Sequence, residues 1–195
     1  MVRVITPPAP LVGLELARGH LRVDDDTSDV LIEAYIAAAS AHIDGPGGWL
    51  GRAIGIQTLE VRSDRFGSDL FPLAYPPLID VVSVSYDDGD GVAQTLDPDT
   101  YFIDPAGVLL AYGASWPNAR LHRGSVRIRY RAGYVTDPTA SVLEAAVPPA
   151  ITAAVLLMVG DMFSRRETTV DGSVGTVPMS TTVEALLGPY RVWSL

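Results

Sequence analysis

The chain has 195 residues, 48% of them hydrophobic, with a formal net charge of −9, no cysteine, and arginine at all fourteen basic positions. This length and hydrophobicity exclude a disordered chain and favour one domain, or one and a half. The absence of cysteine excludes disulfide scaffolds and thiolate zinc sites, and the acidic balance argues against a dedicated nucleic-acid clamp. We expect no signal peptide over residues 1–13 and no membrane span, because the longest apolar stretch, 150–160, is too short.

The N-terminal part of the chain favours helices. After a Pro-rich extended segment over 1–10, apolar residues three and four positions apart predict a short helix over 11–23. Residues 24–29 then open a second helix that runs to about Asp44, because short polar side chains accept hydrogen bonds from the first turn of a helix. One side of this helix is apolar and another is formed by small residues: Ile32, Tyr35, Ile36, Ala39 and Ile43 against Ala34, Ala37, Ala38 and Ala41.

The middle of the chain, 54–134, has the pattern of β structure. Apolar and polar residues alternate in short runs that Gly, Pro and Asp interrupt. The predicted strands are 54–62, 78–86, 92–96, 101–103, 108–110 and 125–131. The sequence DDGDG at 87–91 predicts a hairpin turn, so we expect a small antiparallel β unit.

A helical pattern returns near the C-terminus. Two prolines at 148 and 149 suit the first turn of a helix that we expect to continue to Arg166. The helix is apolar on two sides, so it must be buried on two sides, against the β unit or a neighbouring subunit. The two sides consist of Ile151, Val155, Met158 and Met162, and of Leu156, Val159 and Phe163. A polar loop over 167–180 and a short helix over 181–187 follow.

No enzyme motif is complete. The chain lacks G-x-S-x-G and H-E-x-x-H, and without lysine it has no P-loop. The glycines of 45–51 suit the end of a helix, and the aspartates of 88–92 lack the glycine of a calcium loop. The three histidines are scattered, so we predict no catalytic, cofactor-binding or metal-binding residues. A pair of aspartates in a small hydrolase stays open as an alternative, since 23 acids offer many pairs.

Charge is divided unevenly along the middle of the chain. Residues 63–104 hold nine aspartates and one arginine, whereas 118–131 hold five arginines and no acid. Arg127, Arg129 and Arg131 share one side of a predicted strand. These arginines can pair with carboxylates on adjacent strands, contact another copy of the protein, or bind phosphate.

The C-terminal tail carries Tyr190, Arg191, Val192 and Trp193. Tyrosine, arginine and tryptophan are enriched among the residues that dominate binding energy at protein interfaces. The tail therefore either binds a partner or folds back on its own core.

Several short motifs follow one another in a specific order. They are LELARGHLRVD at 14–24, DVLIEAYIAAA at 29–39, YPPLIDVVSVSY at 75–86, VRIRYRAGY at 126–134, and VPPAI at 147–151 leading to RE at 166–167. In this order the chain resembles the head–tail connector (adaptor) proteins of long-tailed bacteriophages and gene transfer agents. One departure is Gly13, where that family more often has a helix-capping Ser or Thr.

The resemblance implies an α+β fold, a small helical bundle with an antiparallel β unit inserted between the second and third long helices. On this basis 1–50 forms the N-terminal helices, 54–134 the inserted β unit, 148–166 the core helix, and 167–195 an extended tail with a short helix. It also implies a non-enzymatic role. Such subunits form a ring, commonly of twelve copies, below the portal in the neck of a particle assembled in the bacterial cytoplasm.

The implied partners are the portal protein, a stopper or tail-completion protein, and further copies of the chain. DNA would pass through the ring without sequence-specific binding, and neither a cofactor nor a membrane is involved. We predict subunit contacts through Ile151, Val155, Met158, Met162, Arg127, Arg129 and Arg131, and portal contacts through Tyr190, Arg191, Val192 and Trp193. A ligand-binding β module that uses Tyr112 and Trp116 as a stacking platform is the alternative from another class.

Overall fold

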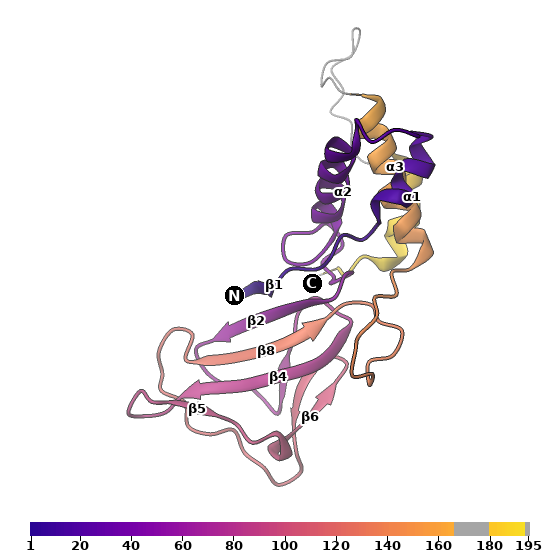
Figure 1. Cartoon of the computed structure of the whole chain (residues 1–195). Coiled ribbons are helices and arrows are strands. Elements are labelled where there is room, and N and C mark those ends of the chain that lie inside the picture. Colours follow the sequence, from indigo (N-terminus) through magenta and orange to yellow (C-terminus); the bar gives the residue numbers. More distant parts are fainter. Residues whose placement is uncertain (166–179, 194–195) are drawn as a thin grey trace. The chain divides into compact units, whose positions relative to one another are not determined.

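A computed structural model describes residues 1–165 and 180–193 (Figure 1). The chain divides into two compact units. The β unit consists of Met1–Pro8 and Arg52–Ala146, and the helical unit of Ala9–Gly51 and Val147–Leu195. The predicted α+β class, with a β unit inserted in a helical bundle, is confirmed. Within the described ranges, no helix has the length and apolarity needed to cross a bilayer.

The helical unit contains α1 (Leu14–Leu21), α2 (Asp29–Ile43), α3 (Pro149–Ser164), α4 (Thr181–Leu187) and the 3-10 helix η2 (Gly188–Tyr190). Helix α3 packs against α1, α2 and α4. The predicted apolar side of α2 is the buried one, with Ile32, Ile36 and Ile43 inaccessible or nearly so. The alanines on its other side are exposed in the described chain.

The start of α2 differs in detail from the prediction. The carboxylate of Asp25 accepts a hydrogen bond from the backbone N–H of Thr27 (3.0 Å), and no side chain caps the first turn of the helix. Arg18 of α1 instead links the two helices: it lies 3.5 Å from the Asp29 carboxylate and donates to the carbonyl of Asp24 (2.9 Å). A charged side chain thus replaces the predicted cap in joining α1 to α2.

The β unit contains two antiparallel sheets. The first has the strand order β1-β2-β8-β4-β5, and the second has the order β3-β7-β6. The strands are β1 (Val2–Thr6), β2 (Gln57–Ser63), β3 (Leu70–Pro72), β4 (Leu78–Asp87), β5 (Ala93–Thr95), β6 (Tyr101–Asp104), β7 (Gly107–Leu110) and β8 (Val126–Ala132). All six predicted strands and the hairpin at 87–91 are present, and the short helix η1 (Pro98–Thr100) precedes β6.

Two strands were not predicted. Residues 2–6, which the sequence analysis grouped with the N-terminal helices, form β1 and pair with β2, with Val4 opposite Leu59. Strand β3 is only three residues long and ends at a proline, so it has little periodic signal. The N-terminal segment therefore belongs to the β unit, because its backbone groups are satisfied by β2.

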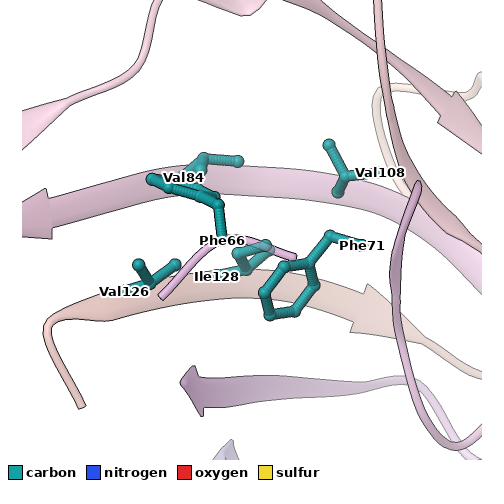
Figure 2. Close-up of a cluster of buried hydrophobic side chains, with 6 residues drawn as sticks. All are labelled: Phe66, Phe71, Val84, Val108, Val126 and Ile128. Carbon is teal, nitrogen blue, oxygen red and sulfur yellow. The ribbon is translucent and has the colours of Figure 1, made fainter. Parts of the chain in front are cut away.

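The two sheets share a hydrophobic core (Figure 2). Phe71 and Val108 come from the second sheet and pack with Val84 and Ile128 of the first. Along β8, the side chains alternate, so that Val126, Ile128 and Tyr130 are fully buried while the arginines between them point to the opposite face. The Tyr130 hydroxyl donates to the Ala74 carbonyl (2.8 Å), which satisfies it inside the core.

We expect Ile128→Ala to destabilise the β unit by about 2–5 kcal/mol, because it leaves a cavity among fully buried side chains. Urea unfolding followed by circular dichroism measures this. Val142→Ala is the control, since Val142 is 76% exposed and should change the midpoint little. Equal midpoints for the two variants would contradict the assignment of Ile128 to the core.

Candidate interaction surfaces

The arginine face is the side of the first sheet that carries Arg127, Arg129 and Arg131. Arg129 lies directly opposite Glu60 of β2, and its guanidinium donates to that carboxylate (2.9 Å). Arg131 lies opposite Asp80 of β4 and donates to it through Nε (2.9 Å). Each arginine is therefore paired within the chain through cross-strand geometry.

Arg127 makes the third pair, with Asp87 at the end of β4. Its two terminal nitrogens donate to the two carboxylate oxygens at 2.6 and 3.0 Å, a bidentate arrangement. This hydrogen bonding lowers the pKa of Asp87 below its usual value and raises that of Arg127. The pair is thus fixed in its charged form at neutral pH.

Glu60 is the hub of the arginine face. Its side chain is only 4% exposed, and besides Arg129 it accepts from Arg62 Nε (2.9 Å) and lies 3.4 Å from Arg3. Burial by itself would raise the pKa of Glu60, but hydrogen bonds from Arg129 and Arg62 outweigh it and hold the pKa below its usual value. One buried carboxylate therefore connects β1, β2 and β8.

Of the three interpretations of the arginine stripe, pairing with carboxylates on adjacent strands is confirmed for the described residues. The pairing does not neutralise the face. Five arginines stand against three carboxylates, a formal excess of two positive charges: Arg3, Arg62, Arg127, Arg129 and Arg131 against Glu60, Asp80 and Asp87. Contact with another copy stays a prediction for this surplus.

The C-terminal tail folds back on the helical unit through residue 193. The Arg191 guanidinium lies between two indole rings, 4.2 Å from the centre of Trp49 and 4.1 Å from that of Trp193. The backbone N–H of Val192 donates to the Leu50 carbonyl (2.9 Å). Trp193 nevertheless stays 71% exposed, so the tail presents one large aromatic side chain to solvent.

Helix α3 presents its predicted contact residues unequally. Ile151 and Val155 are fully buried within the chain itself, whereas Met158 and Met162 are half-buried. A side chain with no accessible surface adds little to a contact between rigid subunits. The two methionines are therefore the members of this set that a neighbouring copy could reach.

The residues of the alternative functions are differently placed. Trp116 stacks on Phe66 with ring centres 4.6 Å apart and donates from its indole nitrogen to the Ser68 carbonyl (2.8 Å), so it serves the core of the β unit. Tyr112 is fully exposed. The described carboxyl groups with a shifted pKa all move downward, because hydrogen bonds favour their charged forms, and this is opposite to the shift that suits a general acid: Asp25, Glu60, Asp87, Asp88 and Asp137. The described residues include no cluster of three or more metal-ligating side chains.

Sequence reasoning missed three participants in these surfaces: Glu60, Arg3 and Trp49. Glu60 is the only acid on the predicted strand 54–62, which marks it as unusual, but its role follows only when that strand is placed beside β8. Trp49 and Arg3 are brought to their partners by contacts that span most of the chain or two separate strands. No local pattern contains that information.

Comparison with solved structures finds the same fold in gene transfer agent particles. The chain is similar to one in the virion of a native gene transfer agent (GTA) particle, with TM-score 0.75 and 21% identity over 100% of this chain and 97% of that one. Chains in the neck of an empty GTA particle computed with C6 symmetry (TM-score 0.73, 23%) and in the neck of a native particle computed with C12 symmetry (0.69, 20%) are similar over the same shares of both chains. No protein-family model and no curated protein sequence matches the chain. At this level of identity the likeness shows a common fold.

We expect Glu60→Gln to lower the free energy of unfolding by about 1–3 kcal/mol at neutral pH, because it removes hydrogen bonds between charged groups. The pKa of Glu60 is lowered in the folded chain, so its contribution is present above the unfolded value of 4.5 and is lost as the pH falls through the folded value. The difference between wild type and variant should therefore shrink on acidification below pH 4.5.

Urea titrations over a pH series measure this difference. Asp90→Asn is the matched control, since Asp90 is an exposed acid without an ion pair among the described residues. A gap between wild type and Glu60→Gln that is the same at every pH would contradict the role of the Glu60 charge.

Proposed function

We propose that the chain is a non-enzymatic structural subunit of the neck of a phage-like or gene transfer agent particle. The observation that carries this proposal is the match of both units, over the whole chain, to proteins of GTA particles and their necks. The ordered sequence motifs support the same class independently. The subunit would be incorporated into particles that assemble in the bacterial cytoplasm.

The subunit would act as a connector, or adaptor, in a ring beneath the portal. The sixfold and twelvefold symmetries of the similar necks support a ring of twelve copies. A ring needs a heterologous contact, in which two different surfaces of each copy meet. The surplus positive charge of the arginine face and the half-buried methionines of α3 are surfaces that such a contact could use.

The charge of the chain suits a DNA channel that does not bind its cargo. A net charge of −9 per copy repels phosphate, and most arginines of the β unit are already paired with carboxylates or placed around Glu60. DNA would therefore pass without sequence-specific contact. The same ring would give a platform to stopper or tail-completion proteins.

The exposed Trp193 is the best candidate for portal contact. It is a large aromatic side chain held in place by the Arg191 stack, so little conformational entropy is lost when a partner covers it. Tyr190, Arg191 and Val192 would act mainly by positioning it. The portal surface that receives it should be an apolar pocket with an acidic rim.

We expect the purified chain to assemble into rings when it is mixed with the portal protein of its own particle. Native mass spectrometry and negative-stain electron microscopy measure the copy number and the shape. Omission of the portal gives the control for self-assembly. Absence of a ring under every condition, together with absence of portal binding, would refute the proposed function.

We expect Trp193→Ala to weaken portal binding by about 2 kcal/mol or more, since exposed tryptophans that become buried dominate such interfaces. The fold should be unchanged, because η2 and the Val192 backbone contact remain. Isothermal titration calorimetry measures the affinity and circular dichroism the fold. Tyr112→Ala, which truncates an exposed aromatic of the β unit, is the control, and equal affinity of the two variants would contradict a docking role for Trp193.

A further inference from the structure

The second sheet of the β unit has an apolar outer face. Val108 and Phe71 point inward and are buried in the shared core (Figure 2). The residues that alternate with them form a row across the three strands, with Phe102 opposite Leu109 and Leu109 opposite Leu70. Phe102 is 61% and Leu109 37% exposed. An antiparallel sheet with one solvated face normally carries polar residues there, so this row marks an interaction surface.

Aspartates surround this row. Asp69 adjoins Leu70, Asp97 and Asp99 lie just before β6, and Asp104 is on the same side of β6 as Phe102. None of the four forms an ion pair within the described part of the chain, although Asp97 and Asp104 accept hydrogen bonds from nearby backbone N–H groups. We call the row and these four residues the acidic apolar face.

A loop of the same unit has the complementary character. Leu121 is 82% exposed and stands between Arg120 on one side and His122 and Arg123 on the other, all three of them exposed. We call residues 120–123 the basic loop. It presents one apolar side chain between positive charges, whereas the acidic apolar face presents apolar side chains between negative charges.

The basic loop is held in place at both ends. The backbone N–H of Arg120 donates to the Asp87 carbonyl (2.8 Å), and that of Gly124 donates to the Asp64 carboxylate (2.9 Å). Gly124 has a positive φ of 73°, which lets the chain turn sharply into β8. A preorganised loop loses little entropy when it binds, so it is suited to act as a docking element.

We propose that the basic loop of one copy docks on the acidic apolar face of the next copy. Leu121 would cover Phe102 and Leu109, and Arg120 and Arg123 would pair with the surrounding aspartates. The inference rests on the proposed ring and names the surfaces that close it. A second copy is the occupant that the page favours, because both complementary surfaces occur once in each chain and so match in number.

The contact is heterologous, as a ring requires. In Figure 1, β8 begins beside β5, to the left of the β unit, whereas β6 lies to its right. The loop that precedes β8 therefore leaves the acidic apolar face of its own chain free. Each copy can then give its loop to one neighbour and receive the loop of another.

Cysteine cross-linking tests this contact directly, because the chain has no native cysteine. We expect the double variant Leu121→Cys with Phe102→Cys to form a ladder of disulfide-linked dimers, trimers and larger species on oxidation. An equal mixture of the two single variants should stop at the dimer. Peptide mass spectrometry should identify a bond between positions 121 and 102.

The matched control is Val142→Cys with Phe102→Cys, since Val142 is exposed to a similar degree but lies outside both surfaces. A ladder no stronger than this control, or a disulfide within a single chain, would overturn the proposal. Electron microscopy of the wild type separates the two levels of inference. Wild-type rings without the 121–102 bond refute only this contact, whereas the bond without wild-type rings or portal binding refutes the neck function.

Charge reversal gives an independent test. We expect Arg120→Glu with Arg123→Glu, and separately Asp69→Arg with Asp99→Arg, each to raise the concentration needed for assembly by about tenfold or more. The side chains of Asp69 and Asp99 make no hydrogen bond within the described part of the chain, so their replacement should not disturb the fold. Arg123→Glu by itself keeps the test valid if the double loop variant fails to fold.

Combining the two reversals in one chain should restore assembly, because the pairing is then inverted. A mixture of the two reversed chains at low salt should give no rescue, since one pairing has two positive surfaces and the other keeps only a single wild-type contact that ends at the dimer. Unchanged assembly of either reversed variant, or no restoration in the combined one, would overturn the proposal.

Discussion

Strict alternation along β8 is the constraint on which the β unit depends. This central strand pairs with both β2 and β4, so its register sets theirs. On one side Ile128 completes the core shared by the two sheets, and on the other Arg129 meets Glu60. A slip of one residue would place arginines in the core and isoleucine among carboxylates, so the core and the ion pairs specify the same register.

The ion pairs add specificity more than they add stability. Arg129 is nearly half exposed, and water recovers part of what its pair with Glu60 provides. Glu60 differs because it is buried and would be costly without partners. Arginine suits this role, since its planar group reaches a carboxylate from several directions while its stem covers neighbouring apolar surface. The exclusive use of arginine in the chain thus has a structural counterpart in the crowding around one carboxylate.

The elements with strong periodicity were predictable from the sequence, and those that depend on distant partners were not. Helix α2 and strand β8 each have a clear apolar side, and both were predicted within a few residues. Strand β1 was missed because its only support is pairing with β2, more than fifty residues away. The arginine stripe was visible as a pattern, but its partners come from β2 and β4, whose order in the sheet no local pattern states. For α3, periodicity showed two apolar sides but could not say that Ile151 and Val155 are already covered within the chain.

The placement of the three tryptophans gives the molecule a built-in optical probe for each unit. Trp116 is stacked on Phe66 in the β unit, whereas Trp49 and Trp193 share the guanidinium of Arg191 in the helical unit. Their indoles therefore have different surroundings, one aromatic and half-buried, the other two polar and cationic. Intrinsic fluorescence of variants that retain one tryptophan can follow the melting of either unit separately, without an added label.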